Sequence, residues 1–593
     1  MTVDQLLQES VKFHTAGDMA NAKKGYAKLL KASPLHPDGL HLSGLIAMQE
    51  GDFKEAERLI RAAIGISPKA VAFHGNLATA LLQLDRIDEA LAGYRHALDL
   101  DPDYIDGWRN LGSLSARTGD HEGAALAYSN VVRLTSGGDG GALGYLGLEL
   151  AVLCDWDNLP AIKQGLEGLP SWRGGNALPA PPFSLLVHDF TPEEQKRFAD
   201  EAASFLENQY KPMSHKPQAR RKKLRLGYLS EDFHDHATAY LMAEALESHD
   251  RSRFEIFAYS YGPPDKGAMR SRLRAACDHW VELGPLSPAD GARRIKADGI
   301  NILVDLKGHT GLARTSILAC RPAPLQVAWL GFPGTFGGTC MDYIIADPFV
   351  IPHGAEANYA EKVVRLPLCY QPNDSRRPRA PVREPKAKWG LPDDAFVICV
   401  FNNTFKINAE ALAVWIGILK THPDTVLWLL DFHPTAADNL RNMTEAVGID
   451  PNRLIFAPRL SHAEHLVRLS AADLFLDTYP CAGHTTASDA LWAGVPLVAW
   501  VGRTFASRVA GSLLHALGFD ELITDSQANY HALAQYLVTD RKTLAQVRAR
   551  LWEVTKTSPV FEGKAFTPAL EAALDTMWAR WEKGLAPEGF DLG

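Results

Sequence analysis

A repeat with a period of 34 residues runs through the first part of the chain and restricts its fold more than any other feature. Small, aromatic and proline positions recur there in one phase. They are Pro34, Pro68 and Pro102; Ala22, Ala56, Ala90 and Ala124; Tyr26, Ile60, Tyr94 and Tyr128; Gly17, Gly51 and Gly119, with Asp85 in the remaining slot; and Gly44, Ala78 and Gly112. Because these columns agree in phase, coincidence is a poor explanation and a repeated structural unit is indicated.

This spacing is the tetratricopeptide signature, in which each unit is a pair of helices. Small residues let the two helices approach closely, aromatic residues fill the groove between them, and proline ends the second helix. We therefore expect units over residues 1–135 that stack into a superhelical segment with a concave face. Such a face typically binds peptides or partner proteins, and self-association into a homo-oligomer is the alternative.

The composition describes a folded protein of several domains. Its 593 residues are too many for one hydrophobic core, and 46% of them are hydrophobic against 22% charged. The net charge of −9 supports neither nucleic-acid nor membrane partners. We interpret the one basic run, Arg220-Arg221-Lys222-Lys223, as a solvated linker.

Cysteine usage and the N-terminus indicate the cytoplasm. The 7 cysteines are single, with no C-x-x-C pair, so reduced thiols are expected and neither a structural zinc site nor a disulfide framework is implied. The N-terminus MTVDQLLQES lacks a basic segment followed by an apolar one. No apolar run reaches the length that a membrane span requires.

After the repeats, the pattern changes twice. Residues 136–220 are expected to be a helical linker region, and from residue 221 short apolar runs alternate with helical segments, as buried parallel strands do. The strands expected within residues 221–375 are LRLGYLS, FEIFAYS, INILVDL, QVAWLGF and DYIIAD. The pattern restarts in residues 376–593, which also hold a C-terminal helix, with AFVICVFNN, TVLWLLDF, RLIFAP, DLFLDT and PLVAWV.

The predicted fold class is α plus α/β, a tetratricopeptide-repeat superhelix followed by a GT-B-type pair of Rossmann-like domains. A large class of nucleotide-sugar transferases uses two such halves, and so do some epimerases. Neither half contains G-x-G-x-x-G or G-x-x-x-x-G-K-[ST], which argues against a dehydrogenase or an ATPase. No isolated D-x-D lies at the end of an expected strand. Asp101-Pro102-Asp103 matches that pattern but lies at a repeat boundary, so the sequence implies no metal ion.

Two segments of the second half carry groups that suit a phosphate. In one, Cys481-Ala482-Gly483-His484-Thr485-Thr486 follows a strand and leads into a helix expected near Thr486, with Asp489 three residues later. N–H groups and hydroxyls at a helix start suit an anion, and a plain capping box of Thr486 with Asp489 is the equal alternative. In the other, Lys406 follows the first strand, where it could reach a diphosphate; a solvated surface lysine is the alternative.

The first half offers acid–base groups at the corresponding edge. Asp232, His234 and His236 lie in the loop after its first strand. A carboxylate and an imidazole near a sugar acceptor could act as general base or position the hydroxyl. Helix capping and packing are the ordinary alternatives for such histidines.

Taken together, four motifs resemble the O-GlcNAc transferase family, including its SPINDLY-like members. They are D-F-x-x-H at 232–236, R-P-A-P-x-Q-x-x-W-x-G-x-P-G-T at 321–335, x-K-I at 405–407 and G-H-T-T-x-x-D-x-L-W-A-G at 483–494. The resemblance covers nearly the whole chain and is closest to the shorter bacterial members. It implies tetratricopeptide repeats joined to a two-Rossmann glycosyltransferase.

The resemblance also implies roles for individual residues. Lys406 would contact the donor diphosphate and neutralise leaving-group charge, while His236 and Asp232 would lie near the acceptor hydroxyl. Asp489 would hold the ribose, and His465 would stack on the uracil. The remaining donor-binding positions are Asn403, Leu460, His462, Arg468, Cys481, Gly483, His484, Thr485, Thr486, Gly331 and Pro333. Which group removes the acceptor proton does not follow from the motifs.

Three positions depart from the animal members of the family. Asn403 replaces a glutamine, His462 replaces a ribose-contacting lysine, and Ala237 replaces the proline that follows the histidine. The first two bear on donor identity.

The sequence therefore predicts an inverting, metal-independent enzyme without a cofactor that moves N-acetylglucosamine from UDP-GlcNAc to Ser/Thr hydroxyls of proteins, which it binds through the repeats. GDP-fucose and UDP-glucose are alternative donors. A non-catalytic repeat protein with a nucleotide-sugar sensor domain is the alternative from another class.

Overall fold

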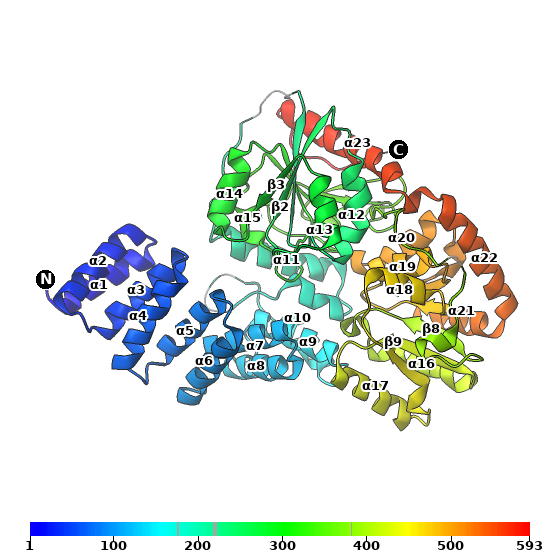
Figure 1. Cartoon of the computed structure of the whole chain (residues 1–593), viewed down its shortest axis with the longest axis horizontal. Coiled ribbons are helices and arrows are strands. Elements are labelled where there is room, and N and C mark those ends of the chain that lie inside the picture. Colours follow the sequence, from blue (N-terminus) through cyan, green and yellow to red (C-terminus); the bar gives the residue numbers. More distant parts are fainter. Residues whose placement is uncertain (173, 175–176, 217–221, 381, 593) are drawn as a thin grey trace. The chain divides into compact units, whose positions relative to one another are not determined.

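A computed structural model describes residues 1–172, 174, 177–216, 222–380 and 382–592. They form two compact units, Met1–Glu149 and Leu150–Gly593 (Figure 1). Arg220 and Arg221 of the basic run lie outside the described residues. Among the helices that the structure describes, none is long and apolar enough to cross a membrane.

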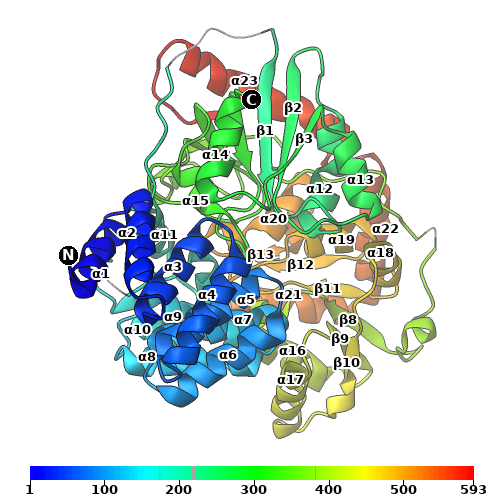
Figure 2. The ribbon, with the colours of Figure 1, turned by 60° about the vertical axis from the view of Figure 1, so that its left-hand side comes forward.

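The first unit consists of helices in which each packs against the next along the chain (Figure 2). The pairs are α1 (Val3–Thr15) with α2 (Met19–Ala32), α3 (Pro37–Gln49) with α4 (Phe53–Ile66), α5 (Val71–Gln83) with α6 (Ile87–Leu100), and α7 (Ile105–Thr118) with α8 (His121–Leu134). A further helix, α9 (Gly140–Val152), follows them. The prediction of helix-pair repeats is confirmed.

The repeated columns lie where helices meet. The four alanines of one column are fully buried, and a Cβ added to Gly112 would approach the Tyr128 ring to 3.0 Å, which explains the small residues there. In the turn between paired helices, Gly17, Gly51 and Gly119 have φ between +77° and +83°, and Asp85 also has a positive φ of 59°. Asp is among the few non-glycine residues that adopt this conformation readily, so it fits the glycine slot.

The second unit contains two parallel sheets. The first has the strand order β14-β7-β6-β5-β4-β1-β2-β3 and the second has the order β10-β9-β8-β11-β12-β13. The strands of the first sheet are β1 (Leu224–Ser230), β2 (Phe254–Ser260), β3 (His279–Glu282), β4 (Ile302–Asp305), β5 (Leu325–Ala328), β6 (Tyr343–Ala346), β7 (Lys362–Arg365) and β14 (Phe590–Asp591). Those of the second are β8 (Phe396–Val400), β9 (Thr425–Leu430), β10 (Leu454–Ala457), β11 (Leu474–Leu476), β12 (Leu497–Trp500) and β13 (Ile523–Thr524).

The strand orders reverse at one place in each sheet. In the first sheet the chain winds outward from β1 through β2 and β3, then returns to add β4 on the other side of β1. In the second sheet the same reversal separates β8 from β11. Ligands of open α/β sheets bind beyond the carboxyl ends of the strands at this reversal, so the loops after β1, β4, β8 and β11 mark the expected site.

Helices connect and cover these strands. The α-helices are α10 (Leu159–Glu167), α11 (Pro192–Glu207), α12 (Ala237–Glu247), α13 (Ala268–Ala275), α14 (Pro288–Ala297), α15 (Thr315–Ala319), α16 (Ala409–Thr421), α17 (Pro434–Ala446), α18 (His462–Leu469), α19 (Thr485–Trp492), α20 (Val509–Ala516), α21 (Gln527–Thr539), α22 (Arg541–Thr557) and α23 (Gly563–Glu582). The 3₁₀ helices are η1 (Pro182–Val187), η2 (Glu356–Asn358), η3 (Lys386–Trp389), η4 (Thr404–Lys406), η5 (Pro451–Arg453), η6 (Phe505–Ser507), η7 (Asp520–Leu522) and η8 (Pro559–Phe561).

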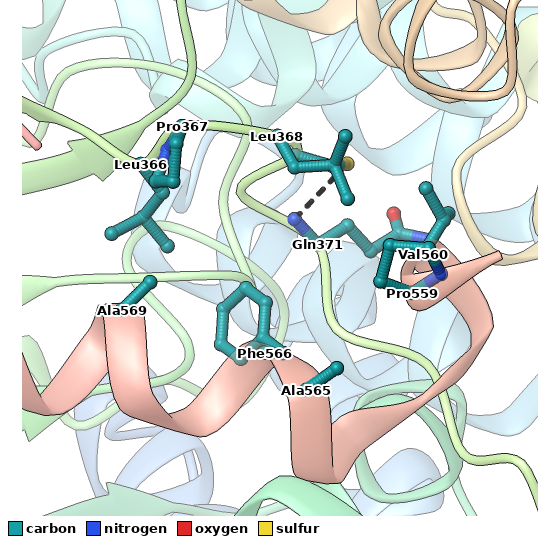
Figure 3. Close-up of a pocket in the computed structure, with 10 residues that line it drawn as sticks. Leu366, Pro367, Leu368, Gln371, Pro559, Val560, Ala565, Phe566 and Ala569 are labelled. Atoms are coloured by element: carbon teal, nitrogen blue, oxygen red, sulfur yellow. Dashed lines mark hydrogen bonds between the residues drawn. The ribbon is translucent and has the colours of Figure 1, made fainter. Parts of the chain in front are cut away.

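The C-terminal helix packs on the first half, whereas the sequence predicts it as part of the second. Helix α23 lies against α12, and β14 joins the first sheet beside β7. The Glu571 carboxylate accepts hydrogen bonds from the backbone N–H of Asp250 (2.7 Å) and pairs with His249 Nδ1 (3.0 Å). Phe566 and Ala569 of α23 also line an apolar pocket with Leu366 and Pro367 (Figure 3). Helix α23 and strand β14 therefore belong structurally to the first half.

Candidate active site

The loops at the reversal of the second sheet are joined by a buried hydrogen-bond network. Asn402, after β8, donates from Nδ2 to Asp477 Oδ1 (3.2 Å) and to Thr478 Oγ1 (2.7 Å), both after β11. The Thr486 hydroxyl donates to Asn402 Oδ1. The network fixes the start of α19 relative to the end of β8.

Lys406 provides a positive charge at this point. It ends η4, is half-buried, and its Nζ donates to the carbonyl of Ala482 (2.7 Å). Burial raises the pKa of Asp477 to about 6, although the N–H of Gly483 and the charge of Lys406 act in the opposite direction. Burial and the charge of Lys406 lower the pKa of His484 well below its usual value, so this imidazole is neutral at pH 7. The surface-lysine alternative is wrong for Lys406.

Helix α19 begins at Thr485, with His484 as its N-cap and no capping hydrogen bond from a side chain. The capping-box alternative is therefore wrong: Thr486 bonds Asn402, and the Asp489 side chain is occupied elsewhere. The first N–H groups of a helix have no partner within it, so Thr485 and Thr486 lie where an anion is favoured.

Gly483 is needed for its small size, since its N–H is already bonded within the protein. Its N–H is engaged by Asp477 Oδ1 at 2.6 Å. A Cβ added to it would lie 2.9 Å from Thr486 Oγ1 and 3.0 Å from Asp477 Oδ1. Any larger residue would displace the network described above.

Asp489 is buried on α19 between Arg377 and His462. Its Oδ1 accepts from Arg377 Nη1 (2.8 Å), and its Oδ2 lies 3.2 Å from His462 Nε2. Burial alone would raise the pKa of Asp489, but the hydrogen bond from His462 and the charges of His462 and Arg377 hold this pKa below its usual value. The His462 ring stacks on Tyr240 of α12 with 3.9 Å between centroids. The two halves therefore meet beside this carboxylate.

Beyond Asp489, His465 and Arg468 form a second pair on α18. Arg468 donates from Nε to His465 Nδ1 (3.0 Å) and from Nη1 to the carbonyl of Pro458 (2.5 Å). Burial lowers the pKa of His465 to about 4, so the ring is neutral and carries its proton on Nε2. Leu460, half-buried, lies in the segment that leads into α18. This arrangement holds a fixed imidazole next to Phe401, whose ring is perpendicular to it at 5.2 Å.

At the reversal of the first sheet, Asp232 and His236 lie together after β1. Asp232 Oδ2 accepts from Thr238 Oγ1 (3.3 Å) and lies 3.4 Å from His236 Nδ1. Lys307, after β4, donates to Asp232 Oδ1 at 2.7 Å. Sequence reasoning missed Lys307, because its partners lie more than seventy residues away; the only signal was its position just after a strand at the reversal.

Partial burial and the charge of Lys307 lower the pKa of His236 to about 4. The imidazole is therefore neutral at pH 7. Its Nδ1 faces both the backbone N–H of Thr238 (3.2 Å) and Asp232. If Nδ1 accepts from Thr238, Nε2 carries the proton and can donate to an acceptor oxygen; if Nδ1–H points to Asp232, Nε2 can take the acceptor proton.

Three side chains of this loop could ligate a metal ion. Glu231, Asp232 and His234 each offer a ligand atom within 4.8 Å of the others. The Lys307 ammonium lies 3.3 Å from Glu231 Oε2 and 2.7 Å from Asp232 Oδ1. Lysine therefore already supplies the positive charge between the two carboxylates.

Gly331 and Pro333 lie in the loop after β5. A Cβ on Gly331 would lie 1.9 Å from the carbonyl oxygen of Leu306, so only glycine fits this crossing of two backbone segments. Phe332, between them, packs with Cys481 and Ala506 of the second half. Through Phe332, the loop that holds Gly331 and Pro333 therefore contacts the loop that precedes α19.

Comparison with known proteins identifies the family. A model described as glycosyl transferase family 41 matches residues 198–377 and 371–570. The chain belongs to glycosyl transferase family 41. Two tetratricopeptide repeat models match residues 15–71 and 47–114.

Individual relatives of this family 41 chain carry consistent names. A probable UDP-N-acetylglucosamine–peptide N-acetylglucosaminyltransferase of Arabidopsis thaliana is 36% identical over 63% of this chain and 39% of its own length. The UDP-N-acetylglucosamine–peptide N-acetylglucosaminyltransferase of Caenorhabditis elegans is 31% identical over 61% and 41%. A mutant of the Thermobaculum terrenum O-GlcNAc transferase is 27% identical, with a TM-score of 0.63 and 98% coverage of both chains. The chain spans about two fifths of the length of these curated relatives.

At the three positions where the family 41 chain differs from the animal members, the side chains or backbone fit their immediate surroundings. Asn403 Oδ1 accepts from the N–H of Phe405 (3.2 Å) and so caps the turn that carries Lys406. His462 binds Asp489 and Tyr240, as described above. Ala237 is the first residue of α12, a position that also accepts proline.

One contributor to the family 41 site lies within residues 136–220, for which the sequence predicts a helical linker region. Leu186 of η1 packs with Cys481 and Ala506, and Phe183 packs against Phe405 at 5.6 Å. Tyr479 donates to Asp189 (2.9 Å) from the same loop as Cys481. The signal that could have found this segment was its run of apolar residues in an otherwise Pro-rich stretch.

Proposed function

We propose that this protein transfers N-acetylglucosamine from UDP-GlcNAc to serine or threonine hydroxyls of polypeptides. The observation that carries the proposal is the juxtaposition of Lys406 with the start of α19, which gives a positive site for a diphosphate at the reversal of the second sheet. The names of the family 41 relatives support this donor and this class of acceptor.

In this mechanism, the acceptor oxygen attacks the anomeric carbon on the face opposite to UDP, and the configuration inverts. Lys406 and the N–H groups of α19 stabilise the charge that develops on the departing UDP. Asp489 binds the ribose hydroxyls, and His465 stacks on the uracil. His236, with Asp232 beside it, orients the acceptor hydroxyl or takes its proton.

GDP-fucose is the alternative donor. A non-catalytic repeat protein that senses a nucleotide sugar is the alternative to an enzyme. The matched SPINDLY proteins of several plants are also named for UDP-N-acetylglucosamine, which favours UDP-GlcNAc. Lys406, His236 and Asp489 each lie after a strand at the reversal of one of the two sheets, which favours an enzyme over a sensor.

A thermal-shift panel of UDP, GDP, UDP-GlcNAc, UDP-glucose and GDP-fucose tests the donor. We expect stabilisation by the UDP species only, because a ligand at about 100 times its dissociation constant adds about 2.7 kcal/mol to the free energy of unfolding. Stabilisation by GDP and GDP-fucose, with none by UDP, would contradict the proposed donor.

Transfer should not depend on a divalent metal ion. Lys406 and α19 supply the charge for the diphosphate, and Lys307 occupies the position between the carboxylates of Glu231 and Asp232. We therefore expect the rate to change less than about twofold after EDTA treatment, whereas bound Mg²⁺ normally bridges carboxylates and phosphates. A rate that collapses with EDTA and returns with Mn²⁺ or Mg²⁺ would refute metal independence.

The repeat array is proposed to bind protein acceptors, with self-association as the alternative use. Deleting residues 1–100 removes α1–α6 and keeps α7 and α8, which cover α9: the Tyr128 and Tyr145 rings stack at 5.2 Å, and Arg109 bonds Asp139 at 2.6 Å. Because repeats depend mainly on their neighbours, the catalytic unit should stay folded.

For this truncation we expect transfer to short peptides to persist and transfer to whole proteins to fall at least about tenfold, because the array no longer adds to acceptor affinity. Rates on both acceptor types, with the molecular mass of each form in solution, check this. Equal transfer to whole proteins by both forms would show that the array does not select acceptors.

A reducing compartment, with the cytoplasm as the expected one, is also proposed. All 7 cysteines are free, and six of them are buried. Such thiols are typical of proteins outside the secretory pathway.

A further inference from the structure

Arg377 lies in the segment that connects the two sheets and reaches the candidate donor site. We define residues 371–380 as the crossing segment. Its Ser375 N–H donates to Glu244 Oε2 of α12 (2.7 Å), which anchors one end to the first half. Two residues later, Arg377 enters the second half and is 5% exposed. The crossing segment therefore carries one buried cation to α19.

Hydrogen bonds and two aromatic rings hold the Arg377 guanidinium in place. It donates to Asp489 Oδ1 (2.8 Å), to Ser488 Oγ (3.3 Å) and, through Nε, to the carbonyl of Asp374 (3.1 Å). Its carbon lies 5.2 Å from the centre of the Trp492 ring and 5.6 Å from that of Phe561. A planar, hydrogen-bonded guanidinium holds a carboxylate in one orientation far better than a flexible ammonium does.

The pairing leaves Asp489 able to bind a ligand. A carboxylate has about four acceptor positions, and Arg377 and His462 occupy only part of them. A buried ion pair is seldom needed for stability, since apolar residues of similar volume often serve as well. The position of Asp489, one turn into the helix whose start faces the diphosphate site, points to use by the same ligand.

We propose that Arg377 is a positioning residue that holds the Asp489 carboxylate where it accepts the ribose hydroxyls of the donor nucleotide. This inference rests on the proposed function, which supplies the nucleotide. It assigns nucleotide recognition to a residue outside both sheets, in the connection between the halves.

The chain offers a matched control two residues away. Arg379 is half-buried and packs on the rings of Trp552 (3.7 Å) and Trp492 (5.1 Å), much as Arg377 packs on Trp492 and Phe561. Its hydrogen bonds go to Thr555 Oγ1 (2.6 Å) and the carbonyl of Trp552, not to Asp489. Arg379→Met therefore removes a comparable packed cation without disturbing the carboxylate.

The experiment titrates the full-length protein with UDP and with 2′,3′-dideoxy-UDP by calorimetry. The wild type should bind UDP at least about tenfold more tightly, because the dideoxy compound leaves Asp489 without hydroxyl partners. In Arg377→Met, UDP binding should weaken about 10- to 100-fold and the two compounds should bind within about threefold of each other. Arg379→Met should keep the wild-type ratio.

A purely structural role for Arg377 would lower the melting temperature and leave the ratio of the two affinities unchanged, and that result would overturn the inference. If Arg377→Met does not fold, Arg377→Lys decides: it should give an intermediate ratio, and a wild-type ratio would overturn the inference. A wild type that binds both compounds equally would also overturn it. A wild type that binds no UDP would instead refute the proposed donor, so the two failures are distinguishable.

Discussion

Lys406→Ala should reduce the rate of transfer about 10²–10³-fold, because removing one positioned donor to a developing anion typically has this effect. The half-buried ammonium bonds the carbonyl of Ala482 and acts on both Asp477 and His484, so its charge lies at the start of α19. The rate constant should fall more than the affinity for UDP-GlcNAc, since the leaving-group charge develops only in the transition state. Steady-state transfer with saturating acceptor measures both.

Lys420→Ala is the matched control for this variant. Lys420 is exposed at the end of α16 in the same half, so its loss should leave the rate within about twofold, as is usual for surface substitutions. A Lys406→Ala protein with normal melting temperature and near-normal rate would show that the leaving-group charge is stabilised elsewhere.

His236→Ala should reduce transfer about 10²–10⁴-fold while leaving UDP affinity nearly unchanged. His236 caps α12 in the first half, whereas the nucleotide contacts proposed here lie in the second. A group that acts on the reacting hydroxyl lowers kcat and kcat/KM together. Transfer rates, read beside a calorimetric titration with UDP, separate the two effects.

His353→Ala serves as the control, because His353 is exposed on the first half and pairs only with Asp591 at 3.4 Å among the described contacts. A large loss of UDP affinity in His236→Ala, with a normal maximal rate, would place His236 at the donor and remove it from the acceptor chemistry.

Much of the fold could be predicted because it is encoded locally. The strings LRLGYLS and FEIFAYS coincide with β1 and β2, since continuous apolar runs belong to strands buried on both faces. Strand β3 was not predicted, because as an edge strand it keeps His279 and Glu282 exposed and loses that signal. The return of α23 and β14 to the first sheet depends on partners such as His249 and Glu571, more than three hundred residues apart, which no local pattern reports.

The residues of the candidate site also fall into those that a local motif predicts and those that depend on partners far away in the sequence. Lys406, His236 and the start of α19 follow strands and carry recognisable motifs, so the sequence predicts their location. Arg377, Lys307 and Tyr240 act through partners in other elements and were not predicted. Gly483 lies in the segment predicted to bind a phosphate, and its N–H bonds Asp477, a pairing that only the folded loop reveals.

The most direct test of the account is the product of the reaction. The wild type and Lys406→Ala are incubated with UDP-GlcNAc or GDP-fucose and a library of peptides that each contain one serine or threonine, and the products are analysed by mass spectrometry and by the anomeric coupling in NMR. We predict one N-acetylhexosamine in β linkage on the hydroxyl side chain, from UDP-GlcNAc only, and far less product with Lys406→Ala. Fucosylated peptides from GDP-fucose, or an α-linked N-acetylglucosamine, would contradict an inverting transfer from UDP-GlcNAc.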